Sequence, residues 1–144
     1  MSSERKKQLV RRLYEEAWGR GELAVIDELF ADEYTRHDLR PMAARPGPAG
    51  QRQIAEDFRT AFPDIEMTVD LLIADGDYVV ARWTAEGTNT GPWGGGGQAT
   101  GRRARISGVN IFRFEGERVA ELWNHRDDLG MMEQLAAPIY SGGA

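Results

Sequence analysis

The fold of this chain is decided by residues 103–127, RARISGVNIFRFEGERVAELWNHRD, where apolar and polar side chains alternate on both sides of Glu115 and Gly116. A period of two residues is typical of β-strands with one buried face. A glycine that follows an acidic residue between two such runs indicates a tight turn. The stretch therefore predicts an antiparallel hairpin of strands 103–114 and 117–127.

The expected turn determines which side chains of this hairpin share a face. If the turn has two residues, Phe114 lies opposite Glu117, and counting outward pairs Gly108 with Trp123. Directly opposite residues point to the same side of a sheet. One face then carries Asn110, Phe112, Val119, Glu121, Trp123, His125 and Asp127. A register shift of one residue would exchange the two faces.

A second hairpin precedes the first in the chain. Residues 65–74 and 78–88 alternate in the same way around Asp75 and Gly76. This Asp-Gly pair favours a type I′ turn, in which both central residues have positive φ.

Helical periodicity occupies the rest of the sequence. Apolar residues recur every three to four positions in three N-terminal segments, and again in a short segment near the C-terminus. These segments are residues 9–18, residues 23–30, the stretch between Gly50 and Pro63, and residues 128–136. Three helices followed by antiparallel strands indicate an α+β domain with helices packed on one face of a sheet.

The bulk composition excludes several classes of protein. The 144 residues, 41% of them hydrophobic, suffice for one domain over residues 1–144. A formal net charge of −5 repels phosphate backbones and anionic membranes, so we expect no nucleic acid and no membrane as partners. The chain has no cysteine and therefore no disulfide or thiolate site. No apolar segment follows the charged N-terminus and no apolar run reaches about 20 residues, which predicts a cytoplasmic location.

Asp127 and His125 are the candidates for proton exchange. They lie two residues apart on one strand, so their Cα atoms are about 6–7 Å apart and both can reach one substrate. Burial raises the pKa of a carboxyl group towards neutrality, where acid–base catalysis operates. Alternatively, Asp127 or Asp128 caps the final helix. A metal site of Glu121, His125 and Asp127 is disfavoured because one strand spreads its side chains in a line.

Sequence motifs for other chemistries are absent. There is no Gly-x-Ser-x-Gly elbow, no Walker loop and no Rossmann glycine fingerprint. Four glycines at positions 94–97 lie in a loop between the two hairpins, next to Trp93. This tryptophan is either the lip of a pocket or an anchor of the loop.

Several longer stretches together carry a family resemblance. They are RLYEEAWGRGEL, a histidine at position 37 before a Pro/Gly-rich loop, AFPDI, ADGDYVVARWTAEGTNTG and FEGERVAELWNHRDDLGMMEQL. Over nearly its whole length the chain resembles the SnoaL-like polyketide cyclases, a branch of the NTF2-like superfamily. The most specific part is the set Glu121, Trp123 and Asp127, followed by Gln134 and Leu135.

The resemblance implies a fold and an assembly. Its members are cone-shaped α+β proteins, so we expect three N-terminal helices packed on a curved, antiparallel-rich sheet, with a short C-terminal helix. They enclose a deep hydrophobic pocket between helices and sheet. They are commonly oligomeric, which implies a homodimer or homotetramer.

The resemblance also implies a reaction. The best-understood branch closes the last ring of an aromatic polyketide by intramolecular aldol condensation, without a metal or cofactor. Its acid/base aspartate matches Asp127, while His125 or Asn110 would polarise the substrate oxygen. The implied ligand is a hydrophobic or aromatic polyketide. The pocket walls would be His37, Tyr14, Trp18, Tyr34, Trp83, Phe112, Glu121 and Trp123.

Two alternatives remain open at the level of sequence. A second branch of the family hydroxylates anthracycline-type polyketides in the same pocket without a cofactor, and the architecture also serves non-catalytic modules that bind small molecules. The charged pair His125 and Arg126 between Trp123 and Asp127 departs from the simplest cyclase pattern, which leaves the reaction type undecided.

Overall fold

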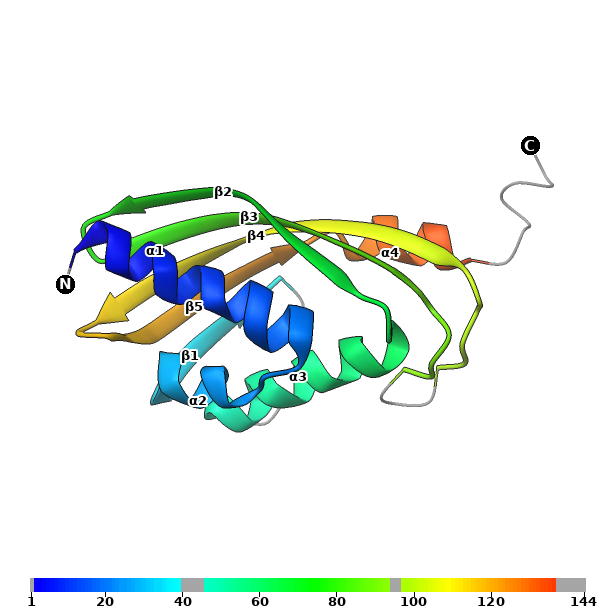
Figure 1. Ribbon diagram of the computed structural model, residues 1–144, viewed down its shortest axis with the longest axis horizontal. Coiled ribbons are helices and arrows are strands. Elements are labelled where there is room, and N and C mark those ends of the chain that lie inside the picture. The colour runs from blue at the N-terminus through cyan, green and yellow to red at the C-terminus, as the bar shows by residue number, and fades with distance from the viewer. Residues whose placement is uncertain (1, 40–45, 94–96, 137–144) are drawn as a thin grey trace.

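The computed structural model describes residues 2–39, 46–93 and 97–136, which form a five-stranded mixed sheet with helices packed against it (Figure 1). The strands lie in the order β1-β5-β4-β3-β2. Neighbouring strands are antiparallel, except that β1 runs parallel to β5. Their bounds are β1 Phe30–Asp38, β2 Glu66–Asp75, β3 Tyr78–Thr88, β4 Arg103–Glu115 and β5 Arg118–Arg126.

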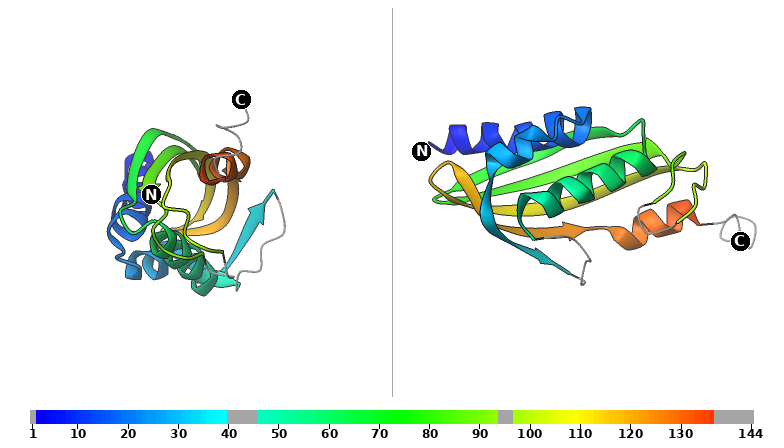
Figure 2. Two further views of the ribbon diagram at one scale, coloured as in Figure 1. Left: turned by 90° about the vertical axis from the view of Figure 1, so that its right-hand side faces the viewer. Right: turned by 90° about the horizontal axis from the view of Figure 1, so that it is seen from below.

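The helices close the concave side of this sheet. Seen along the long axis of the molecule, the sheet curls and the N-terminal helices cover its open side (Figure 2). The helices are α1 Ser3–Arg12, the π-helical η1 Leu13–Trp18, α2 Ala24–Leu29, α3 Gly47–Ala61 and α4 Asp128–Leu135. The predicted α+β arrangement of N-terminal helices, curved sheet and short C-terminal helix is confirmed. In the described part of the chain, no helix combines the length and apolar content that crossing a membrane requires.

The first helix changes its winding where it meets the sheet. At Leu13 the α-helix widens into the π-helical turn η1, a rare geometry that often occurs at functional sites. The turn buries Tyr14. It also lays Trp18 against Phe58 of α3, with ring centroids 5.4 Å apart. The wider winding thus directs two aromatic side chains towards the space between helices and sheet.

Helix α3 starts earlier than its apolar pattern predicts. It begins at Gly47 rather than after Gly50, with a proline in its first turn. Proline suits that position because the first turn of a helix leaves its N–H groups without intrahelical partners. The inner side of α3 buries Gln51, Ile54 and Phe58.

Both hairpin turns lie one residue later than predicted. Asp75 pairs with Tyr78, and Glu115 pairs with Arg118, so glycine is the first of the two loop residues in each hairpin. Gly76 and Gly116 have φ of 58° and 61°, and no non-glycine residue of the described chain has positive φ. Positive φ at the first central position alone is typical of a type II′ turn, so the expected type I′ turn is wrong.

The register of the β4–β5 hairpin also differs from the predicted one. Phe114 pairs with Val119, but the next pair is Arg113 with Glu121, so a β-bulge places Ala120 outside the ladder. Beyond the bulge, Asn110 lies opposite Asn124 rather than Glu121. Because side chains alternate along a strand, the extra residue transfers the rest of β5 to the opposite face. The concave face therefore carries Leu122, Asn124 and Arg126, and the outer face carries Glu121, Trp123 and His125.

One buried asparagine fastens the loop after β3 to the end of α3. Asn89 is completely buried, and its amide nitrogen donates to the carbonyl oxygens of Ala61 and Gly91, both at 3.0 Å. Its side-chain oxygen accepts from the N–H and hydroxyl of Thr100, at 2.9 and 3.0 Å. A Cβ at position 91 would lie 1.8 Å from the carbonyl oxygen of Thr60, so only glycine allows this approach.

Trp93 anchors the same loop. Its ring meets the rings of Phe58 and Phe62 edge-on, with centroids 5.2 and 5.5 Å apart. It does not line the internal cavity. Of the two roles considered for this residue, the structure shows the loop anchor.

Candidate functional site

A narrow cavity lies between the helices and the concave face of the sheet. The space unoccupied by atoms is about 500 Å³, part of it open to solvent. Apolar side chains from η1, α3, the segment before β2 and four strands form most of the wall. They include Leu13, Phe58, Ile65, Met67, Ile106 and Leu122. A mostly apolar lining with a few polar groups is the composition expected of a site for a small hydrophobic ligand.

Three aromatic side chains form one end of the wall. The ring of Tyr14 lies 6.5 Å from that of Trp83 and 6.3 Å from that of Phe112, centroid to centroid. Trp83 lies over Gly108 of β4, where a Cβ would come within 2.6 Å of its ring. The indole Nε1 of Trp83 is buried and has no hydrogen-bond partner among the described residues. A buried donor without a partner is costly, and a ligand oxygen would satisfy it.

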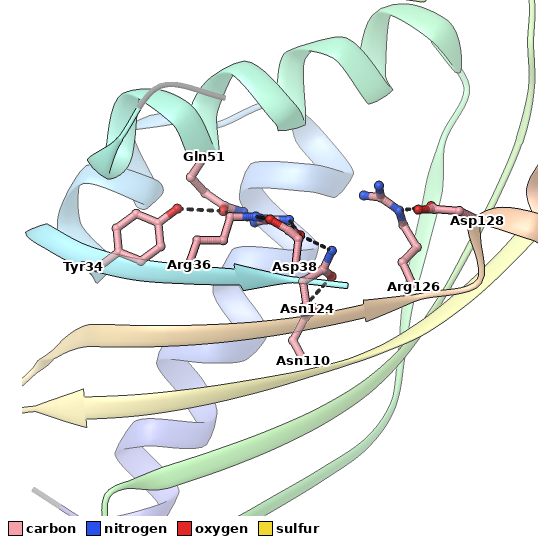
Figure 3. Close-up of polar contacts among 8 residues, drawn as sticks. All are labelled: Tyr34, Arg36, Asp38, Gln51, Asn110, Asn124, Arg126 and Asp128. Atoms are coloured by element: carbon pink, nitrogen blue, oxygen red, sulfur yellow. Dashed lines mark hydrogen bonds and ion pairs between the residues drawn. The ribbon is translucent and has the colours of Figure 1, made fainter. Parts of the chain in front are cut away.

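Polar side chains cross the cavity wall as one directed chain of hydrogen bonds. The Tyr14 hydroxyl donates to Asn110 Oδ1 at 2.7 Å, and Asn110 Nδ2 donates to Asn124 Oδ1 at 2.8 Å. Asn124 Nδ2 then donates to Asp38 Oδ1 at 3.0 Å (Figure 3). Every donor points towards the Asp38 carboxylate, so the carboxylate fixes the orientation of both amides. Each amide nitrogen retains a second N–H.

Arg36 binds Asp38, the last acceptor in this series of hydrogen bonds. Arg36 donates from Nε to Asp38 Oδ2 at 2.8 Å and from Nη2 to Asp38 Oδ1 at 3.0 Å, which is a bidentate ion pair. Both side chains are 13% exposed. Arg36 Nη1 also donates to Gln51 Oε1 at 2.8 Å, and the Tyr34 hydroxyl donates to the same oxygen at 3.3 Å (Figure 3). Helix α3 and strand β1 are thereby joined at the cavity.

A second arginine enters the cavity from the end of β5. Arg126 Nε donates to Asp128 Oδ1, and its guanidinium lies over the ring of Phe58, 4.8 Å from the centroid. The terminal nitrogens point away from Asp128 (Figure 3). The side chain is only 12% exposed. Arg36 and Arg126 are the charged residues of the lining. Their partners Asp38 and Asp128 are not part of the lining.

Burial sets the protonation of the two tyrosines. It raises the pKa of Tyr14 well above its ordinary value, although the nearby Arg36 acts in the opposite direction. It also raises the pKa of Tyr34. Both therefore remain neutral phenols near neutral pH and act as hydrogen-bond donors rather than as bases.

Five of the residues that the sequence places at the pocket line this cavity. They are Tyr14, Trp18, Trp83, Asn110 and Phe112. Tyr34 lies just behind the wall, against Gln51. The amide of Asn110 is buried and faces Asn124, an arrangement that the predicted register could not give.

His37, Glu121 and Trp123 lie on the outer face of the sheet instead. His37 pairs with Trp123 across β1 and β5, and the two rings stack with centroids 5.0 Å apart. Glu121 Oε2 lies 2.7 Å from His37 Nε2, and Glu121 Oε1 accepts from Arg113 Nε at 2.9 Å. The prediction that these three residues line the pocket is wrong. For Glu121 and Trp123 the reason is the bulge at Ala120, which the predicted register lacked. His37 was expected at the pocket from the family resemblance, and it lies on the side of β1 opposite to the buried Phe30 and Tyr34.

His125 and Asp127 also lie away from the cavity lining. His125 is exposed on the outer face, opposite Val109. Asp127 is the N-cap of α4, and its Oδ1 accepts from the N–H of Gly130 at 2.9 Å. The cap considered in the sequence is therefore present. The described residues hold no group of three His, Cys, Asp or Glu side chains arranged to bind a metal ion.

Replacing Glu121 by glutamine should destabilise the protein near neutral pH and have less effect in acid. The hydrogen bond from Arg113, and then that from His37, lowers the pKa of Glu121 below its ordinary 4.5. The stabilisation is complete above that ordinary value and is lost as pH falls through the lower folded pKa. Urea unfolding of both proteins at about pH 7 and about pH 3 measures the difference. Glu117→Gln in the exposed turn is the control, and an E121Q effect that does not shrink in acid would contradict the expectation.

Sequence reasoning missed five polar residues of the site: Arg36, Asp38, Gln51, Asn124 and Arg126. Arg36 and Asp38 lie on one side of β1 and His37 lies on the other. The alternation of the strand alone does not tell which of these two sides faces the cavity. The parity of Phe30 and Tyr34, both buried, is the signal that selects Arg36 and Asp38. No comparable signal exists for Asn124, since its face depends on the bulge.

Known proteins were compared with the chain by sequence and by structure. Residues 8–135 match the sequence profile of the SnoaL-like polyketide cyclases. No curated protein sequence matches.

Three solved structures illustrate the similarity. TsrD from Streptomyces laurentii is 30% identical, with a TM-score of 0.83 over 95% of this chain and 98% of its own. A candidate polyketide cyclase from Acidithiobacillus ferrooxidans is 32% identical, with a TM-score of 0.78 over 94% and 97%. AclR from Streptomyces galilaeus, a candidate hydroxylase, is 25% identical, with a TM-score of 0.80 over 93% and 97%.

Proposed function

This chain belongs to the SnoaL-like polyketide cyclase family, and from that premise we propose that it is an enzyme that closes a ring on an aromatic polyketide by intramolecular aldol condensation. The observation that carries the proposal is the make-up of the cavity. It is a mostly apolar cavity whose polar lining consists of the Tyr14 hydroxyl, amides and guanidinium groups, and the Asp38 carboxylate behind them orients Asn124 and Arg36. Such a wall favours negative charge on a substrate oxygen.

The reaction needs an enolate held close to a carbonyl group. A carbon between two carbonyl groups is already acidic, so a site that stabilises the enolate oxygen can promote loss of its proton. The second N–H groups of Asn110 and Asn124 are the donors for that oxygen. The cavity holds the two reacting carbons together, and positioning of this kind supplies much of the acceleration in intramolecular reactions.

Asp38 is the carboxylate that we assign to proton exchange. Asp38 lies behind the cavity lining, so in this proposal one water molecule relays the proton of the acidic carbon to its carboxylate as the new carbon–carbon bond forms. The same path returns the proton to the oxygen of the former carbonyl group. Its Oδ1 accepts two hydrogen bonds and its Oδ2 one, so Oδ2 retains capacity for a proton. The sequence assigned this role to Asp127, which caps α4, and that assignment stays a prediction.

A hydroxylase is the second candidate. The lining contains no carboxylate among the described residues, and the same donors would stabilise a substrate carbanion that reacts with molecular oxygen. AclR, a candidate hydroxylase, has a similar fold.

One incubation distinguishes the two reactions. The purified protein is mixed, in air and without oxygen, with a tricyclic anthraquinone that bears a 1,3-dicarbonyl side chain. Mass spectrometry and chromatography follow the product. We expect a change of retention at unchanged mass under both conditions, because the aldol step moves a proton without net loss or gain of atoms. A gain of oxygen only in air, as the hydroperoxide or as the alcohol formed when an added reductant such as a thiol reduces it, would instead identify a hydroxylase.

A further inference from the structure

We propose that Arg126 is a specificity residue that binds a carboxylate of the ligand, so that the preferred ligand of the cavity is a flat aromatic acid rather than its ester. This proposal builds on the proposed function, because it names a feature of the substrate that the cavity accepts. It depends on the hydrogen bonds that Arg126 leaves unused and on its place beside Trp83.

The two cavity arginines differ in how many of their donors are occupied. Two nitrogens of the Arg36 guanidinium donate to Asp38 and the third donates to Gln51, so each nitrogen has a protein partner. Arg126 makes one hydrogen bond, from Nε to Asp128, within the described structure. Both of its terminal nitrogens remain, and these present the two parallel N–H groups that bind a carboxylate in a bidentate manner.

The surroundings of Arg126 make such an interaction effective. The side chain is 12% exposed and its stem lies on the concave face of β5. A charge that is largely removed from water gains more from a charged hydrogen-bond partner than one at the surface. Phe58 lies below the guanidinium plane at 4.8 Å and helps to hold its orientation. The two terminal nitrogens of Arg126 are thus oriented before a ligand binds.

Trp83 supplies a second donor in the same row of the sheet. Trp83 pairs with Gly108, and Gly108 pairs with Arg126, so the three residues lie side by side across β3, β4 and β5. The indole leans over Gly108, whose missing Cβ leaves room for it. Its buried Nε1–H has no partner in the described part of the chain. One ligand carboxylate between the tryptophan and the arginine would satisfy both donors.

The charge of the lining agrees with an acidic ligand. Its charged members are Arg36 and Arg126, both cationic. The carboxylates of Asp38 and Asp128 hold these arginines in place. Their guanidinium groups face the cavity together with neutral amides.

The test uses an unreactive probe pair. Binding of anthraquinone-2-carboxylate and of its methyl ester is measured by titration calorimetry for the wild type, Arg126→Met, Arg126→Lys and the control Arg118→Met, which changes an exposed arginine of the same strand. The wild type and the control should bind the acid at least about tenfold more tightly than the ester. Arg126→Met should lose this preference and keep its affinity for the ester, while Arg126→Lys should keep part of the preference, because lysine retains the charge without the fork.

Several outcomes would overturn the proposal. They are equal binding of acid and ester by the wild type, no binding of either probe, and an acid preference that survives in Arg126→Met. The ester serves as an internal check that the variant still forms the cavity. Because neither probe can undergo ring closure, an acid preference without turnover of the dicarbonyl substrate would refute the proposed reaction and leave the carboxylate site standing.

Discussion

Replacing Asn89 by aspartate is expected to lower the free energy of unfolding by about 3–5 kcal/mol. The change keeps the shape of the side chain but removes the two N–H donors that bind the carbonyl oxygens of Ala61 and Gly91. Each buried hydrogen bond that is lost costs about 1–3 kcal/mol, and the new negative charge faces two carbonyl oxygens in a completely buried position.

Urea unfolding, followed by tryptophan fluorescence, measures this difference. Gln98→Glu is the matched control, because it makes the same chemical change at an exposed position of the same loop. It should alter the unfolding free energy by less than about 0.5 kcal/mol. If the Asn89 variant behaves like the control, the loop is not held by this side chain.

Replacing Asp38 by asparagine should reduce turnover by about 10²–10⁴-fold. The variant loses the only carboxylate that is hydrogen-bonded to both Asn124 and Arg36 in the described structure. Asp127→Asn should keep wild-type rates, because asparagine caps a helix as well as aspartate does. Rates of ring closure for the two variants, measured side by side, decide which carboxylate exchanges the proton.

Folding must be measured in the same experiment. Asp38→Asn leaves Arg36 with no carboxylate partner at a largely buried position, and such a change costs about 3–5 kcal/mol of stability. Circular dichroism gives the folded fraction, and the rate is expressed per folded molecule. Full activity per folded molecule in Asp38→Asn, or its loss in Asp127→Asn, would return the acid/base role to Asp127.

The sequence predicts the elements of this fold well, because each leaves a local signal. The period of two residues and the glycines of the turns locate the four antiparallel strands within a residue or two. The turn type is wrong because the glycine takes the first loop position, where a single positive φ is enough. The parallel pairing of β1 with β5 has no local signal, since it depends on residues far apart in the chain.

The candidate site is harder to predict, and the β-bulge at Ala120 is the reason. A bulge changes the hydrogen-bond ladder by one residue without a distinctive side chain. Its consequence is that Glu121, Trp123 and His125 face outward while Asn124 and Arg126 face the cavity. Tyr14, Trp18 and Trp83 lie outside β5, so the bulge does not affect them, and they line the cavity. A prediction of which side chains share a face depends on the strand register, so it is less reliable than a prediction of where helices and strands lie.

The parallel pairing of β1 with β5 determines when the site can form during synthesis of the polypeptide. Asp38 and Asn124, which share a hydrogen bond, are 86 residues apart. A ribosome that adds about 5–20 residues per second needs about 4–17 seconds to make the intervening chain. During that interval Arg36 and Asp38 have no β5 to pack against. The polar wall can therefore be assembled only after Asn124 has been synthesised.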